Sequence, residues 1–156
     1  MKLHLWVLLW LPLAGCASQQ ERALMRLNEV AERVLAQECA RPQLSYRAVE
    51  NAHVSGLVDE VETLRCPGLE AQTYLSEAAA NPRGMPIYLH VFAPHPALPG
   101  FMNIGAGAEG VIEVLGRPAR QDARQLRYQS GETTDSVTFR LRGNRIGAIR
   151  WEWYFD

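Results

Sequence analysis

Apolar residues recur at helical spacing between residues 21 and 38. Positions three and four apart lie on one face of an α-helix, so this pattern predicts an amphipathic helix whose apolar stripe packs on the core. Glu29 and Arg33, one turn apart, form a favourable pair on the polar flank. The Arg41-Pro42 pair marks the end of this helical stretch. The apolar positions are Ala23, Leu24, Leu27, Val30, Ala31, Val34 and Leu35.

The segment from residue 55 to residue 80 fits two structures. Its apolar residues at 57, 58, 61 and 64 have helical spacing, but the runs 61–64 and 72–75 also flank the turn Pro67-Gly68 as the strands of a hairpin would. Pattern alone leaves helix and strand open here. The run 87–92, which follows a turn at residues 81–84, is rich in β-formers and predicts a strand.

The segment from residue 107 onwards predicts a helix and then strands. The apolar run 111–115 is followed by Gly116, which suits the end of a helix, and by Pro118, which stops its continuation. Three strands are expected next, centred on Tyr128, on residues 137–141 and on residues 145–155, with the last two joined by a tight turn. The expected fold class is therefore α+β: an N-terminal amphipathic helix plus an antiparallel sheet, and a C-terminal helix followed by a three-stranded meander.

The last hairpin contains a conflict of register. A two-residue turn pairs Phe139 with Ala148, which places Trp151 and Trp153 on the face opposite Phe139. Either Gly147 is a β-bulge that shifts the register and brings the tryptophans inward, or both faces of the sheet are apolar and something covers the second one. Both interpretations remain open at this stage.

If the second face is covered by a partner, its composition is that of a binding hot spot. Tryptophan and arginine are the residues enriched in such spots. The residues expected at or near the contact surface with a partner are Arg140, Arg142, Arg150, Trp151 and Trp153.

The N-terminus resembles an export signal. Lys2 supplies a charged start, and the apolar run 3–13 is too short to span a bilayer as a finished helix. The four residues Leu13-Ala14-Gly15-Cys16 look like the cleavage and acylation site of a bacterial lipoprotein. That resemblance implies a signal peptide at residues 1–15, removed on export, and an acylated Cys16 as the membrane anchor.

The anchor also predicts where the protein works. Two or three acyl chains hold a protein on its membrane far more firmly than one. Position 17 is Ala rather than the Asp that retains enteric lipoproteins at the inner membrane, which favours the outer membrane and a periplasm-facing domain. Residues 16–20 would be the lipid anchor and a short tether, and residues 21–156 a single α+β domain.

Two further cysteines are expected to form a disulfide. Cys39 and Cys66 have no third metal ligand nearby, and the periplasm is oxidising, so pairing is favoured over a metal or catalytic role. The alternative is two separately buried thiols.

Charge is unevenly distributed along the chain. Residues 117–156 carry eight arginines against five acidic residues, so the C-terminal quarter is basic. An acidic protein surface or lipid headgroups are the candidate partners, and nucleic acid is not expected in the periplasm. The alternative is that the arginines are simply solvent-exposed residues on the outer face of a sheet.

The C-terminal third resembles the small outer-membrane lipoproteins of the SmpA/OmlA (BamE) type, whose domain is likened to the β-lactamase-inhibitor-protein fold. The resemblance covers about fifty residues and implies a non-enzymatic scaffold that presents a sheet or loop to another protein. It also favours strands in the segment 55–80. The residues that carry it are Ile104-Gly105, the run 111–115, Leu115-Gly116-Arg117-Pro118, Tyr128, Val137-Thr138-Phe139, Gly143 and the run 146–151.

No motif for catalysis or cofactor binding stands out. The run 105–110 spells G-x-G-x-x-G, but a dinucleotide site needs a βαβ unit, whereas antiparallel strands are expected here. His90 and His95 lack a nearby acidic or cysteine ligand, so no metal is expected, and no cofactor or enzymatic activity is expected either.

The expected function is that of a lipid-anchored, non-enzymatic protein-binding module, accessory to envelope or outer-membrane protein assembly. The alternative is an immunity or inhibitor lipoprotein that neutralises a toxin or enzyme delivered to the periplasm. The expected partners are the membrane, through the lipid anchor, and another envelope protein or a secreted effector.

Overall fold

The structure is a computed structural model, and it describes residues 19–77, 81 and 83–154. The predicted signal peptide at 1–15 and the acylated Cys16 lie outside the described residues. In chain order, the elements are α1 (Gln19–Leu35), β1 (Gln43–Glu50), β2 (Val58–Cys66), β3 (Leu69–Leu75), β4 (Met85–Val91), the short 3₁₀ helix η1 (Gly100–Met102), α2 (Ala108–Leu115), β5 (Arg120–Asp122), β6 (Gln125–Gln129), β7 (Ser136–Arg142) and β8 (Arg145–Glu152).

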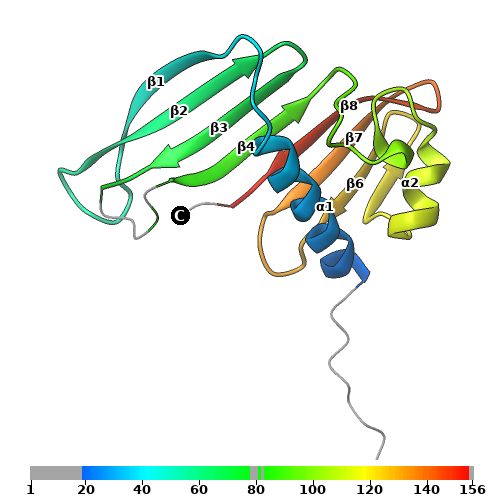
Figure 1. The fold of residues 1–156 in the computed structure, drawn as a ribbon. Helices are drawn as coiled ribbons and strands as arrows, with labels where there is room; N and C mark the ends of the chain where they lie inside the picture. Colours follow the sequence, from blue (N-terminus) through cyan, green and yellow to red (C-terminus); the bar gives the residue numbers. More distant parts are fainter. Residues whose placement is uncertain (1–18, 78–80, 82, 155–156) are drawn as a thin grey trace, which may run out of the picture.

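All eight strands form one antiparallel sheet, in the order β1-β2-β3-β4-β8-β7-β6-β5 (Figure 1). The predicted α+β fold with a separate three-stranded meander is therefore wrong, since the protein is mostly sheet, at 42% strand against 21% helix. The physical reason is the pairing of β8 with β4, in which Leu89 lies opposite Trp151. This pairing joins the C-terminal strands to the N-terminal ones, and β5 adds a further strand at the far edge.

The sheet consists of two halves with the same order of elements. α1 precedes the antiparallel strands β1 to β4, and α2 precedes the antiparallel strands β5 to β8. The last strand of each half pairs with the last strand of the other.

Helix α1 crosses one face of the sheet (Figure 1). The residues that it buries belong to the predicted apolar stripe, but the helix ends at Leu35 rather than at residue 38. The Trp151 indole donates a hydrogen bond to the Leu27 carbonyl, 3.1 Å away. At the start of α1, Glu21 accepts hydrogen bonds from the Ser130 hydroxyl at 3.1 Å and the Gly131 N–H at 3.0 Å. The helix thus packs largely on the strands of the C-terminal half.

A β-bulge at Gly147 resolves the register conflict. Leu141 lies opposite Ile146, but Arg140 lies opposite Ala148, so Gly147 is the extra residue on β8. The shift places Trp151 opposite Val137, and both side chains are buried on the α1 side of the sheet. The bulge is therefore the correct one of the two alternatives.

The segment that pattern left open forms strands β2 and β3. They are joined at the expected turn, where Gly68 has a φ of 81°, a conformation that glycine adopts without steric cost. A Cβ on Gly68 would clash with the Cβ of Ala93, so the close approach of this neighbouring segment also requires glycine.

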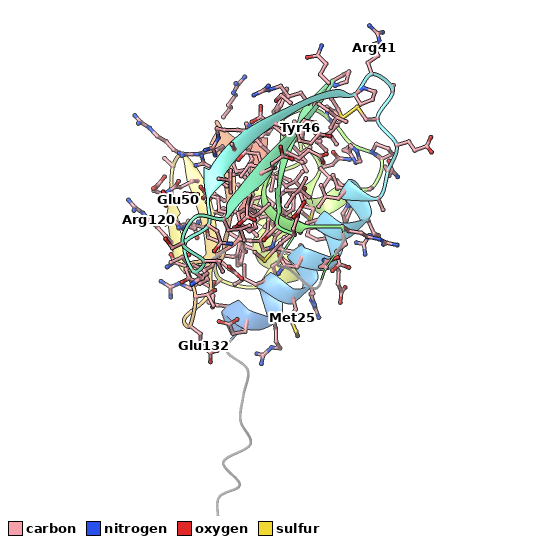
Figure 2. The ribbon with its side chains drawn as sticks, turned by 90° about the vertical axis from the view of Figure 1, so that its left-hand side faces the viewer. Met25, Arg41, Tyr46, Glu50, Arg120 and Glu132 are labelled. Atoms are coloured by element: carbon pink, nitrogen blue, oxygen red, sulfur yellow. A yellow bond between two sulfur atoms is a disulfide. The ribbon has the colours of Figure 1, made fainter. Side chains whose placement is uncertain are left out.

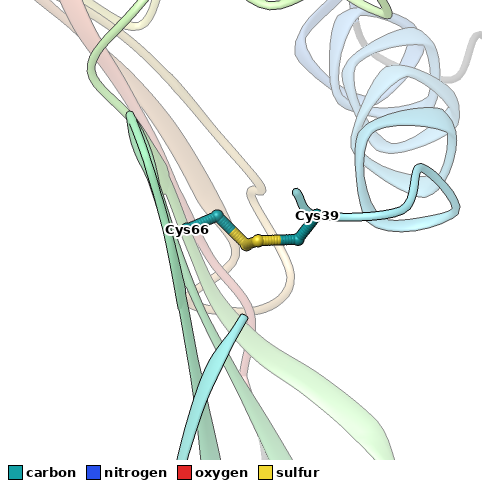
Figure 3. Close-up of a disulfide and its surroundings, with 2 residues drawn as sticks. All are labelled: Cys39 and Cys66. Carbon is teal, nitrogen blue, oxygen red and sulfur yellow. A yellow bond between two sulfur atoms is a disulfide. The ribbon is translucent and has the colours of Figure 1, made fainter. Parts of the chain in front are cut away.

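A disulfide ties the segment after α1 to the sheet (Figure 3). It joins Cys39 to Cys66 at the end of β2, and the two Cα atoms lie 5.9 Å apart, within the usual range for disulfides. This bond holds the C-terminal end of α1 near the strands of the N-terminal half.

We expect the protein to lose stability above pH 10 through Tyr128. Its side chain is buried and its hydroxyl donates a hydrogen bond of 2.8 Å to the Gly116 carbonyl. Burial raises the pKa of Tyr128 to about 12, from the usual 10.0 of a tyrosine. Between these two pH values the unfolded chain releases the phenolic proton while the folded protein keeps it, so unfolding becomes easier as the pH rises.

Urea denaturation at pH 9, 10 and 11 measures this effect. The Tyr128→Phe variant loses one hydrogen bond, so it should be less stable at pH 9, but its stability should fall less steeply with pH. Equal slopes for the two proteins would contradict the assignment to Tyr128.

Candidate functional site

None of the helices among the described residues covers the sheet face opposite α1, and this face carries the candidate site. Along β7, Val137 and Phe139 point towards the helix and are buried, whereas Arg140 and Arg142 point the other way and are exposed. Figure 2 shows α1, with Met25, and Arg120 of β5 on opposite sides of the molecule.

A row of polar residues crosses this open face from strand to strand. Cross-strand partners share a face of the sheet. In this row, each residue lies opposite the next one on the neighbouring strand. The order is Arg120, Arg127, Thr138, Arg150, His90 and Glu70. We call the exposed and half-buried arginines on this side the arginine face. Its members are Arg120, Arg124, Arg127, Arg140, Arg142 and Arg150.

The acidic residues on this face pair with particular arginines. The separations between nitrogen and carboxylate oxygen are 3.8 Å for Arg150 and Glu152, and 3.9 Å for Arg120 and Asp122. On the neighbouring strands, Arg65 pairs with Glu70 at 3.0 Å. Within the described part of the chain, the guanidinium groups of Arg124, Arg140 and Arg142 have no ion pair. This part of the face therefore carries uncompensated positive charge.

A shallow groove lies where those three arginines meet the bulge. Its lining comes from the end of β4, the β5–β6 turn, the end of β7 and the bulged part of β8, and it contains no acidic residue. The lining residues are His90, Phe92, Arg124, Arg140, Leu141, Arg142, Gly147 and Ala148.

His90 contributes an uncharged ring to the groove. Burial lowers the pKa of His90, the positive charge of Arg150 lowers it further, and Glu70 opposes the shift only in part. The His90 and Phe92 rings lie with their centroids 5.2 Å apart. Phe92 is 47% exposed, so the groove offers an apolar surface beside its positive charges.

The structure separates the predicted partner-binding residues into two groups. Arg140 and Arg142 are exposed on the open face, and Arg150 is half-buried there. Trp151 is fully buried under α1, so it cannot contact a partner in the folded protein. Trp153 is half-buried on the same side, and its indole donates a hydrogen bond of 3.1 Å to the Asn28 side chain.

Arg124 and Phe92 were not predicted from the sequence. Arg124 comes from the β5–β6 turn, and Phe92 follows β4, so neither belongs to the hairpin that drew attention to the other arginines. Only the pairing of β4 with β8 and the register of β6 on β7 place them beside Arg140.

A second exposed surface lies on β1 and β2, beside α1 rather than opposite it. Leu44 and Tyr46 are 54% and 55% exposed, and the Tyr46 hydroxyl donates a hydrogen bond of 2.9 Å to Glu62. That hydrogen bond raises the pKa of Tyr46. Glu60 and Glu50 share this side of the strands, so the surface is acidic and differs in kind from the arginine face.

The described residues contain no cluster of side chains suited to hold a metal ion. None of their helices is long and apolar enough to cross a membrane.

Comparisons of this chain with protein-family models, with curated proteins and with solved structures found no match. The described residues form a single antiparallel sheet with a basic open face. The resemblance to the SmpA/OmlA (BamE) type remains a prediction.

Proposed function

We propose that the protein is an envelope lipoprotein, anchored to the outer membrane through Cys16, that binds another protein and does not catalyse a reaction. The observation that carries the proposal is the open sheet face with its unpaired arginines. Arginine is enriched at protein interfaces, and a single-sign patch on one side steers partners of opposite charge. The partner would present an acidic surface to the face.

The same geometry suits two kinds of partner. One is a component of the machinery that assembles the envelope or the outer membrane, as the sequence resemblance implies. The other is a secreted effector that the protein neutralises. The identity of the captured partner separates these two versions.

We expect charge reversal on the face to abolish capture of the partner. The experiment is a crosslinking pull-down of the tagged full-length protein from its own envelope, comparing wild type with the double variant Arg140→Glu, Arg142→Glu. Recovery of the partner should fall at least about tenfold, which corresponds to roughly 1.4 kcal/mol of binding free energy. Both side chains are exposed, so the fold should tolerate the change.

The matched control reverses the same number of charges elsewhere. Arg33 lies on α1 and Arg41 in the segment that follows it, and both are exposed. The double variant Arg33→Glu, Arg41→Glu should retain capture. Equal loss in both double variants, or a reproducible partner unaffected by either, would contradict the proposed face. The Cys16→Ala variant tests the anchor separately, since it should leave the membrane fraction.

A further inference from the structure

We propose that the groove at the Gly147 bulge binds an extended acidic segment of a partner polypeptide. In this arrangement, carboxylates two residues apart engage Arg140 and Arg142, and a neighbouring apolar side chain contacts Phe92. The inference rests on the proposed function and specifies which part of the partner binds to the arginine face.

The groove carries uncompensated positive charge. Three guanidinium groups, those of Arg124, Arg140 and Arg142, line it, and its lining contains no carboxylate. The acidic residues Glu70, Asp122 and Glu152 on this face already pair with other arginines. Like charges held together repel one another, and an anionic ligand removes that repulsion.

The backbone at the bulge leaves room for the Arg142 side chain. A Cβ on Gly147 would lie 3.1 Å from the Cγ of Arg142, 3.2 Å from its Cδ and 3.3 Å from its Nε. The Arg142 side chain therefore lies across the bulge in space that a larger residue at position 147 would occupy. The bulge both corrects the register of β8 and makes room for this arginine.

Arg124 is held by its own turn. Asp122 accepts hydrogen bonds from the N–H groups of Arg124 at 2.8 Å and Gln125 at 3.1 Å. The Arg124 carbonyl in turn accepts a hydrogen bond of 2.7 Å from the Leu141 N–H. These bonds fix the turn against the end of β7, beside the other two arginines.

The spacing of Arg140 and Arg142 matches that of alternate residues in an extended peptide. Arg140 and Arg142 are alternate residues of one strand, so their Cα atoms lie roughly 6.6 Å apart. Alternate residues of an extended peptide have the same spacing, and each of their carboxylates can accept two hydrogen bonds from one guanidinium. A peptide with acidic residues two apart therefore matches both arginines in register, which favours a peptide over a single small anion.

Phe92 supplies the apolar contact. Its ring is 47% exposed, next to the uncharged His90. An aromatic or aliphatic side chain of the peptide, beside the acidic pair on the β8 side, would cover this ring.

The test uses purified full-length protein and synthetic peptides in isothermal titration calorimetry. The probe is a blocked peptide with two glutamates at alternate positions and a phenylalanine beside them. The comparison peptide has glutamine in place of both glutamates. We expect the acidic peptide to bind at least about tenfold more tightly, because hydrogen bonds to charged groups are the stronger ones.

Two variants test the groove itself. Arg142→Gln and Gly147→Ala should each raise the Kd for the acidic peptide about tenfold, whereas the control Arg33→Gln, which changes an exposed residue of α1 on the other side of the sheet, should change it less than about twofold. Urea denaturation verifies that each variant is folded. If Gly147→Ala fails to fold, the Kd of the Arg142→Gln variant alone tests whether the groove binds the acidic peptide.

Several results would overturn the inference. These are equal affinity for the two peptides, an equal effect of the Arg33→Gln control, or binding of inorganic phosphate as tight as that of the acidic peptide. If a partner is recovered from the envelope and its capture does not depend on Arg142, the groove is not the binding site, but the proposed function is not contradicted. Arg142-dependent peptide binding without any envelope partner would contradict the proposed function and leave the peptide specificity of the groove intact.

Discussion

Replacing Trp151 with alanine should lower the free energy of unfolding by about 3 to 5 kcal/mol, the usual cost of truncating a buried aromatic side chain. Trp151 has no exposed surface and lies between α1 and the middle of the sheet, opposite Leu89 on β4 and Val137 on β7. The change would leave a cavity and would also remove the hydrogen bond that the indole donates to the Leu27 carbonyl. The free energy of unfolding of a whole domain is about 5 to 15 kcal/mol, so this one substitution would remove a large share of the stability.

Urea denaturation followed by circular dichroism measures the effect. Trp153→Ala is the matched control, because that indole is only half-buried and should cost less. A Trp151→Ala protein that keeps its stability but loses its partner would contradict the buried position and return Trp151 to the contact surface.

Removing the disulfide should lower the free energy of unfolding by about 3 to 4 kcal/mol, because the bond closes a loop of nearly thirty residues and restricts the unfolded chain. Cys39 and Cys66 are 27 residues apart in the sequence. The double variant Cys39→Ala, Cys66→Ala and the wild type in reducing agent should show the same lowered urea midpoint. A wild-type midpoint that does not respond to reducing agent would show that the bond is absent in the isolated protein.

The helices were predicted more accurately than the sheet, because the pattern that specifies a helix is local. The spacing of apolar residues between 21 and 38 specifies the buried face of α1, which the structure contains. Strand pairing depends on residues far apart in the chain. Nothing near Trp151 in the sequence indicates that it lies beside Leu89, and this pairing turns two expected units into one sheet.

The candidate site was predicted only in part for the same reason. Arg140 and Arg142 were identified because they lie in the last hairpin, in the basic C-terminal part of the chain, and arginine is enriched in binding hot spots. Arg124 and Phe92 reach the same groove only through the tertiary pairing of strands. The placement of Trp151 depended on the single extra residue Gly147, whose role as a bulge the sequence offered as one of two alternatives.

The position of α1 has a consequence for the order of events during synthesis. Among the described elements α1 comes first in the chain, yet the Trp151 ring on which it closes belongs to β8, the last strand. The hydrophobic core therefore cannot be completed until β8 has been synthesised. Contacts between such distant parts of a chain slow folding.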